Sequence, residues 1–178
     1  MVYRRKPELG QVERVRNPGG GTPTIEAQWF ASAGDRLFRN ALVTAQFKAS
    51  NWDEIGGWNC YITNLIKEAD YAERWKKKGA NNRIDAATLW APLLDWEIQV
   101  AKPKLIVLMG GVVRQLVTEL GHQGLLRLPV IATIDHYSYV AHRPKGQLGP
   151  MHPTRVADYH RDMKNIRAQF ERLSAKQH

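Results

Sequence analysis

The stretch K-L-I-V-L-M-G-G at residues 104–111 decides the fold class of this chain. An unbroken apolar run closed by two glycines is typical of a central parallel strand, which is buried on both faces of its sheet. Apolar residues at helical spacing predict a helix at 112–120, and a second strand is predicted at 128–134. Before the stretch, residues 85–101 are predicted to form an amphipathic helix through Leu89, Leu93, Trp96, Ile98 and Val100.

The alternation of strands and helices continues on both sides of this region. Apolar residues recur at helical spacing over 34–47, and W-N-C-Y-I-T-N-L-I at 58–66 has the composition of a buried strand. A C-terminal amphipathic helix is expected after Arg155. We therefore predict an α/β protein with a three-layer α/β/α architecture and a central, mostly parallel four-stranded sheet. Residues 1–24, basic and rich in Gly and Pro, would form an N-terminal segment, and residues 25–178 a single domain.

Composition restricts the partners and the compartment of the protein. The 178 residues include 26 basic and 17 acidic side chains, a formal net charge of +9, which favours a polyanionic partner. No apolar run approaches the length of a membrane-spanning helix or a signal peptide, so no membrane partner is expected. The single cysteine, Cys60, excludes an intramolecular disulfide and a cysteine-ligated zinc finger or cluster. We expect a monomer in a reducing, cytoplasmic setting.

The segment M-H-P-T-R at residues 151–155 carries the clearest candidate for chemistry. Proline fixes its own φ angle and biases the residue before it toward extended geometry, so Pro153 would present His152 on a loop. A turn without a functional role is the alternative interpretation of His-Pro. Ligands in parallel sheets bind beyond the carboxyl ends of the strands. Asn64, Gly110 and Asp135, like His152, fall at or just past such ends.

Five motifs together resemble those of the uracil-DNA glycosylase superfamily, in the same order. They are N-P-G at 17–19, F-A-S-A-G-D-R-L at 30–37, Y-I-T-N-L-I-K at 61–67, K-P-K-L-I-V-L-M-G at 102–110 and H-P-T at 152–154. The third and fourth motifs are similar to the bacterial branch that contains an iron–sulfur cluster, and the first two to the mismatch-specific and thymine glycosylase branches. Because such a cluster needs several cysteine ligands, the single cysteine forbids it, and we expect no cofactor and no metal.

The resemblance implies a role for each matching side chain. Asn17 would position the hydrolytic water, Phe30 would stack on the extracted base, and Asn64 would pair with the edge of that base. His152 would stabilise the negative charge that develops on the departing base. Structural alternatives remain open for each residue: a turn at Asn17, a core position for Phe30 and a loop cap at Asn64.

Two neighbouring segments carry additional candidates. The resemblance places Arg155, with Thr154, in the loop that enters the duplex where the base was; a contact to a phosphate is the alternative for Arg155. Residues 135–146 form an aromatic, histidine-rich and basic segment, interpreted as a β-hairpin or surface insertion, or as an element that reshapes the base pocket. Asp135 and His136 could supply a water-activating carboxylate–imidazole pair if Asn17 is not the catalytic residue.

These residues imply a monofunctional DNA glycosylase, which flips a base of duplex or single-stranded DNA and leaves an abasic site. Uracil is the substrate that the resemblance implies first. A bulky modified pyrimidine of phage DNA, such as glucosylated hydroxymethylcytosine, is the second interpretation, and it would make the protein a defence factor. A catalytically silent nucleic-acid-binding module is the third.

Overall fold

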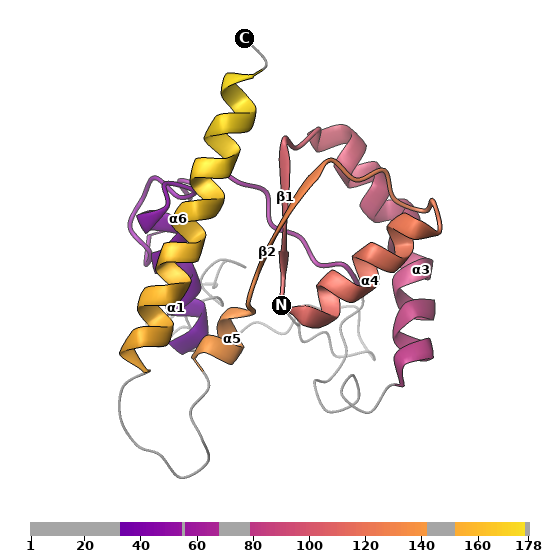
Figure 1. Ribbon diagram of the computed structural model, residues 1–178, viewed down its shortest axis with the longest axis horizontal. Helices are drawn as coiled ribbons and strands as arrows, with labels where there is room; N and C mark the ends of the chain where they lie inside the picture. The colour runs from indigo at the N-terminus through magenta and orange to yellow at the C-terminus, as the bar shows by residue number, and fades with distance from the viewer. Residues whose placement is uncertain (1–32, 55, 68–78, 142–151, 177–178) are drawn as a thin grey trace, which may run out of the picture. The chain divides into compact units, whose positions relative to one another are not determined.

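The computed structural model describes residues 33–54, 56–67, 79–141 and 152–176 (Figure 1). Its helices and strands follow one another as α1 Ala33–Thr44, α3 Ala80–Ala101, β1 Leu105–Met109, α4 Gly111–His122, β2 Val130–Ile134, α5 Tyr137–Val140 and α6 Pro153–Ala175. Contacts within the chain divide it into two compact units. The described part of the first unit is residues 62–67, 79–102 and 115–128, and the remaining described residues belong to the second unit.

The second unit is built on a parallel pair of strands. β1 and β2 pair in register from Leu105 opposite Val130 to Met109 opposite Ile134. α6 packs against both strands and against α1 (Figure 1). The core of this unit consists of apolar side chains from all these elements, whose removal from water is the main stabilising term. Its buried members include Leu37, Phe38, Ala41 and Leu42 of α1, Leu108 of β1, Ala132 and Ile134 of β2, and Tyr159, Met163 and Ile166 of α6.

Two buried cations organise the loop that follows α1. Arg39 is 0% exposed and Lys48 is 1% exposed. The Arg39 guanidinium donates hydrogen bonds to the main-chain oxygen of Trp52 and, at 2.7 Å, to that of Glu54. The charge of a buried arginine is costly unless its N–H groups find acceptors, so these carbonyls fix the path of the loop.

Lys48 and Trp58 complete the same loop. The Lys48 ammonium donates to the Ser50 hydroxyl and to the main-chain oxygen of Gly56. Both cations lie over the Trp58 ring, with Arg39 Cζ 5.2 Å and Lys48 Nζ 5.0 Å from its centroid. An aromatic face attracts a desolvated cation, so the indole supplies part of the stabilisation that water would otherwise give.

In the first unit, α3 buries one apolar face and ends at a left-handed residue. The buried side chains are Ala87, Ala91, Leu94 and Ile98. Lys102 follows the helix at φ 44°, and its N–H donates to the oxygen of Ile98 at 2.9 Å. Asp95 on α3 pairs with Arg127 at 2.6 Å and ties the helix to the segment after α4.

The α/β class and the parallel pairing are confirmed, whereas the four-stranded sheet is not, because the described residues contain two strands. The strand predicted over 58–66 is wrong. In that segment the structure has only an isolated antiparallel bridge between Trp58 and Lys48. The reason is that the Trp58 ring covers the two buried cations instead of entering a sheet core, and Tyr61 is 68% exposed.

Two further differences concern a segment boundary and the type of a segment. α3 begins at Ala80, earlier than predicted. Of the segment 135–146, residues 137–140 form the helical turn α5, so a β-hairpin there is wrong; residues 142–146 lie outside the described residues. The N-terminal segment 1–24 also lies outside them, and the prediction of a single domain over 25–178 stays a prediction.

Two observations concern the predictions made from composition about a membrane partner and about the single cysteine. Among the described residues, no helix is both long and apolar enough to cross a membrane. Cys60, the only cysteine of the chain, is partly buried, and this burial raises the pKa of its thiol to about 11.

Candidate functional site

The candidate site lies in the second unit, where the carboxyl ends of β1 and β2 meet. Gly110 directly follows β1 with φ +92°, a conformation that favours glycine. A Cβ atom at this position would lie 3.1 Å from the Cβ of His136, so the glycine also allows the close approach of that residue. The N–H of Gly110 donates to the oxygen of Ile134 at 2.8 Å, which extends the strand pairing to the edge of the site.

His136 is held in place by the short helix that it begins. Its Nδ1 atom accepts a hydrogen bond from the Ser138 N–H at 3.2 Å and lies 2.6 Å from the Ser138 hydroxyl oxygen. Because Nδ1 accepts this bond, the neutral ring carries its proton on Nε2. Burial lowers the pKa of His136, which favours this neutral form.

Aromatic rings from α1 and α5 form a stack beneath His136. The centroid of the Tyr137 ring is 4.3 Å from that of His136 and 5.0 Å from that of Phe38. Gly34 makes room for this stack, since a Cβ there would lie 3.1 Å from Cδ2 of Tyr137. Burial, with the Asp35 carboxylate next to the phenol, raises the pKa of Tyr137 to about 12. The phenol therefore stays protonated and donates to Asp35.

The first turn of α6 presents the His-Pro motif to solvent. His152 occupies the N-cap position with φ −60° and ψ 117°, and Pro153 begins the helix. The His152 oxygen accepts from the Val156 N–H at 3.2 Å, but its imidazole makes no capping hydrogen bond. The ring is exposed and lies at the positive end of the helix dipole. The predicted loop presentation of His152 agrees with this geometry.

Thr154 and Arg155, the other residues predicted from this motif, are also exposed. The Arg155 guanidinium lies 5.6 Å from the centroid of the Tyr139 ring, so α5 supports the arginine on an aromatic face. A cation–π contact at an exposed site is weak, on the order of 0.5–1 kcal/mol. Arg155 can therefore leave Tyr139 for a ligand at little cost.

Tyr159 of α6 is buried close to Tyr137 and Asp135, and it was not predicted. Its ring is 2% exposed, and no described residue forms a hydrogen bond with its hydroxyl group. Burial, together with Tyr137 and Asp135, raises the pKa of Tyr159 well above its usual value. The helical spacing of α6 places Tyr159 four residues before the buried Met163, and this spacing was the available sequence signal for its burial.

Five of the predicted residues belong to the second unit: Asp135, His136, His152, Thr154 and Arg155. Asp135 is exposed directly after β2, as predicted from the strand end. Asn64 is half-buried and belongs to the first unit. Asn17 and Phe30 lie outside the described residues.

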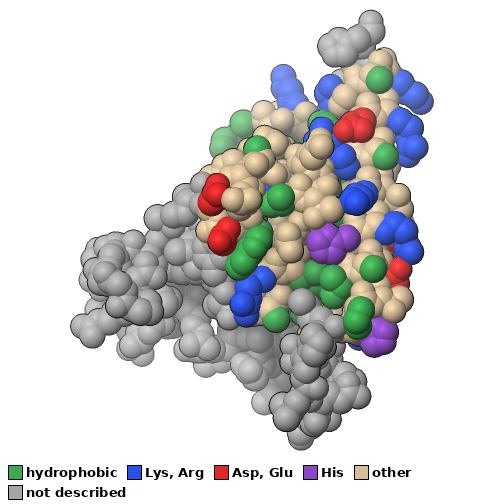
Figure 2. Space-filling model, turned by 90° about the vertical axis from the view of Figure 1, so that its left-hand side faces the viewer, with side chains coloured by type: hydrophobic (Ala, Val, Ile, Leu, Met, Phe, Trp, Pro, Cys, Tyr) green, Lys and Arg blue, Asp and Glu red, His purple; other side chains and the backbone are tan. Residues whose placement is uncertain are grey.

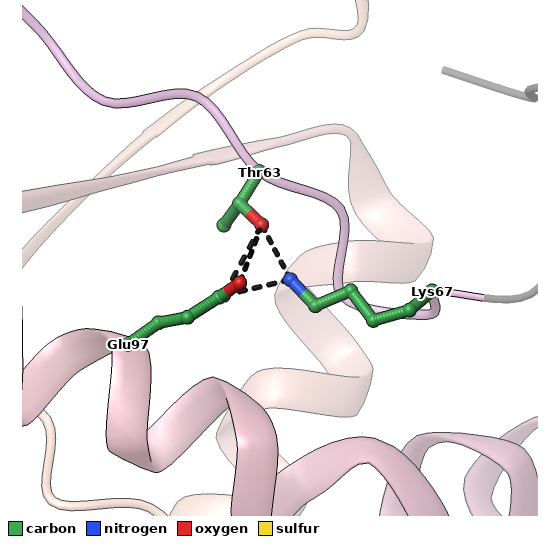
Figure 3. A network of polar contacts seen from close by, with 3 residues as sticks. All are labelled: Thr63, Lys67 and Glu97. Carbon is green, nitrogen blue, oxygen red and sulfur yellow. Dashed lines mark hydrogen bonds and ion pairs between the residues drawn. The ribbon is translucent and has the colours of Figure 1, made fainter.

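Asn64 is flanked by a network of polar side chains (Figure 3). Lys67 Nζ lies 2.7 Å from Glu97 Oε2, and the Thr63 hydroxyl lies 3.1 Å from the same oxygen. The Lys67 ammonium also donates to the Thr63 hydroxyl oxygen. Sequence reasoning missed this network, because nothing in the pattern of α3 pairs Glu97 with the segment 63–67.

The described residues offer no cluster of side chains suited to a metal ion. Within the described residues, no group of three or more His, Cys, Asp or Glu side chains is placed so that it could hold a metal ion. The expectation of no cofactor and no metal thus stays an expectation for the whole chain.

Comparison with protein families decides the affiliation of the chain. The model of the Uracil DNA glycosylase superfamily matches residues 16–166. The chain belongs to this superfamily. The match confirms the resemblance drawn from the order of the motifs, and the members of the superfamily generally are DNA glycosylases. No curated protein and no solved structure matches the chain.

The surface beside the site of this glycosylase superfamily member is basic. Figure 2 shows Lys and Arg side chains along α6, and the sequence of this helix has five basic and three acidic residues. The exposed basic residues of α6 and its C-cap are Arg155, Arg161, Lys164, Arg172 and Lys176. Of these, Arg161 is paired with Asp158 at 2.8 Å. The unequal balance of charge matches a family whose members act on DNA.

Proposed function

We propose that this protein is a monofunctional DNA glycosylase, which hydrolyses the N-glycosidic bond of an extruded base and leaves an abasic site. The observation that carries the proposal is the superfamily match, which spans the region from the first motif to α6. No lysine is singled out as a nucleophile, so we propose no lyase step.

His152 is proposed as the group that stabilises the departing base. As the glycosidic bond breaks, its electron pair moves onto the base, and negative charge appears on the oxygens of the ring. The exposed imidazole at the N-terminus of α6 is a donor that could meet this charge, and the helix dipole adds to its effect. Once bound DNA excludes water from the imidazole, a preorganised donor of this kind is worth about 3–4 kcal/mol in the transition state.

The remaining roles follow the family motifs. We propose that Phe30 stacks on the base, that Asn64 pairs with its edge, and that Arg155 enters the vacated position in the duplex while Thr154 contacts the backbone. The exposure of Arg155 and its weak contact with Tyr139 support this role, because the side chain is free to change partners.

The hydrolytic water has two candidate partners, Asn17 and the pair Asp135–His136. The hydrogen bond from Ser138 N–H to His136 Nδ1 leaves the proton of the neutral ring on Nε2. A nitrogen that already carries a proton cannot accept one, and the other nitrogen is occupied by the cap of α5. This geometry argues against His136 as a general base and favours Asn17, with Asp135 as the second candidate.

The base is proposed to be uracil or a bulky modified pyrimidine. The helical turn α5 begins two residues after Asp135, and its Tyr139 ring lies against Arg155 of the His152 motif. Additional aromatic and polar groups here favour the larger substrate, such as glucosylated hydroxymethylcytosine in phage DNA. A defence role against phage would follow from that substrate, and a repair role from uracil.

The test is a panel of labelled DNA substrates scored for abasic sites by alkaline cleavage. The panel contains uracil in duplex and in single-stranded DNA, thymine opposite guanine, and glucosylated hydroxymethylcytosine. We expect excision, stronger on the modified cytosine than on uracil. The His152→Ala variant should lower the single-turnover rate by roughly two to three orders of magnitude and leave DNA affinity unchanged.

Two further variants and the outcomes of the substrate panel complete this test. Loss of activity in Asn17→Ala but not in Asp135→Ala would support Asn17 as the residue that positions the water, and the reverse would move that role to Asp135. Efficient uracil removal with the modified DNA left intact would restore the repair role. Binding of every DNA without excision of any base would identify a catalytically silent module and overturn the proposal.

A further inference from the structure

The network of Thr63, Lys67 and Glu97 is a closed ring of hydrogen bonds (Figure 3). Lys67 donates to Glu97 and to the Thr63 hydroxyl, and this hydroxyl donates in turn to the Glu97 carboxylate. Both carboxylate oxygens take part, since Thr63 Oγ1 lies 3.3 Å from Oε1 and 3.1 Å from Oε2. Every side chain of the ring thus contacts the other two.

The charged members of this ring are largely removed from solvent. The side chain of Lys67 is 16% exposed and that of Glu97 is 14% exposed. Surface ion pairs in contact with water contribute little, but loss of one member of a partly buried pair leaves the other charge without compensation. The ring is therefore expected to hold its geometry.

The ring brackets Asn64, the residue proposed to read the base. Thr63 directly precedes Asn64, and Lys67 follows one turn later along the same segment. Glu97, on α3, binds both, so each side of Asn64 is attached to the same helix. Residues 61–67 form no strand, so strand pairing with other described residues does not fix the position of Asn64. The hydrogen bonds of Thr63 and Lys67 to Glu97 attach this segment to α3 instead.

We propose that Glu97 is a positioning residue that acts through Lys67 and Thr63 to hold the Asn64 carboxamide in the orientation required to pair with the base. This inference rests on the proposed function. A carboxamide presents a donor and an acceptor in one plane, so a rotated or displaced segment would lose both bonds to the base together. Precise placement of this kind affects the reaction more than the affinity for DNA.

The experiment compares Glu97→Gln, Lys67→Met and the double variant with a matched control. The control is Asp95→Asn, which breaks a second ion pair of α3, the one with Arg127 at 2.6 Å, without touching the ring. Each protein is assayed under single turnover on the panel substrate that the parent cleaves best. The Kd for the same DNA without the target base and the Tm are measured alongside.

We expect each single ring variant to lower the excision rate roughly ten- to a hundred-fold, with Kd changed less than about two-fold. The double variant should be no slower than the slower single variant, because the residues act as one unit. Asp95→Asn should retain the parent rate. Glu97→Ala, assayed as a further variant, should lose more activity than Glu97→Gln, because the glutamine keeps an oxygen that can accept from Thr63.

Several results would overturn the inference while leaving the function intact. One is excision by Glu97→Gln and Lys67→Met at the parent rate. Another is an equal loss in Asp95→Asn, which would reveal a general effect on α3. A third is a rate loss that disappears at lower temperature in step with Tm, which would show a purely structural role. If the parent itself releases no base from any DNA of the panel, the proposed function fails, and the positioning role fails with it.

Discussion

At the scale of single residues, His136 shows how local structure determines a protonation state. Its Nδ1 caps α5, its ring stacks on Tyr137, and Gly110 allows its close approach to the end of β1. Each of these contacts is made by the neutral imidazole, and burial lowers the pKa of the ring accordingly. The folded state therefore resists protonation of this residue more than the unfolded chain does.

This difference predicts a pH dependence of stability. The pKa of His136 is lower in the folded state than its usual value of about 6.5, so the unfolded chain binds the proton more readily below that pH. The free energy of unfolding should thus fall as the pH is lowered from neutral through the folded-state pKa. In His136→Asn, which keeps a capping oxygen without a titrating group, this fall should be smaller.

The measurement is urea unfolding of parent and variant at a series of pH values. Burial also lowers the pKa of His160, so part of the pH dependence is expected to persist in His136→Asn. Replacement of both, in His136→Asn/His160→Gln, should reduce it further. Superimposable pH profiles of the parent and His136→Asn would contradict the prediction.

At the scale of elements, the loop after α1 is fixed from within by cations rather than by strand pairing. Arg39 reaches the carbonyls of Trp52 and Glu54, and Lys48 reaches that of Gly56. Main-chain carbonyls that lose a buried donor retain the full cost of their desolvation. The loop is therefore sensitive to two side chains that lie on or just after α1.

We expect Arg39→Ala to lower the free energy of unfolding by roughly 2–4 kcal/mol, because two bonds from a charged donor to carbonyls are lost. Arg36→Ala is the matched control, since Arg36 is an exposed arginine of the same helix and should change stability by less than about 0.5 kcal/mol. Urea unfolding monitored by far-UV circular dichroism checks both variants. Equal stability of Arg39→Ala and the parent would show that the loop does not depend on the arginine.

The same elements explain which parts of the fold could be predicted from the sequence. The stretch 104–111 was sufficient for β1 because an apolar run before two glycines has few alternatives. The segment 58–66 has a similar composition, but the Trp58 ring packs against the buried Arg39 and Lys48 side chains. This tertiary contact leaves no mark in the hydrophobic pattern of the segment. On α3, Ile98 is buried as predicted, whereas Trp96 and Val100 are 60% and 62% exposed.

Site residues could be predicted where neighbouring residues in the sequence fix their position. They could not be predicted where contacts between distant segments fix it. His152 followed from the proline after it, and Asp135 from the end of a strand. Tyr137 could not be predicted, because its contacts with Asp35 and Phe38 join segments about a hundred residues apart. Asn17 and Phe30 remain predictions.

At the scale of the whole molecule, net charge is the property that bears most directly on function. The chain carries a formal charge of +9, and α6 exposes basic residues beside the His152 motif. DNA binding by such a surface releases counterions, so the affinity falls steeply as salt is added. Charge of this kind acts on every DNA sequence and leaves the choice of base to the site.

We expect the logarithm of the DNA affinity to fall linearly with the logarithm of salt concentration, with a slope that corresponds to several phosphate contacts. Arg155→Gln should reduce the slope by about one. Arg127→Gln is the control, because this exposed arginine is already paired with Asp95 and should leave the slope unchanged. Fluorescence anisotropy with labelled duplex DNA gives these slopes. A flat dependence in the parent would contradict a DNA partner.

The single thiol of the chain, that of Cys60, can be used to measure local opening of the segment around it. With a pKa near 11, this thiol has about a hundredfold fewer reactive thiolates at neutral pH than an ordinary cysteine. An alkylating reagent would therefore modify the native protein slowly, and chiefly when the segment around Cys60 separates from its surroundings. Because no second cysteine competes, the kinetics of alkylation in the native state give the opening frequency of the segment between Trp58 and Asn64, without any engineered label.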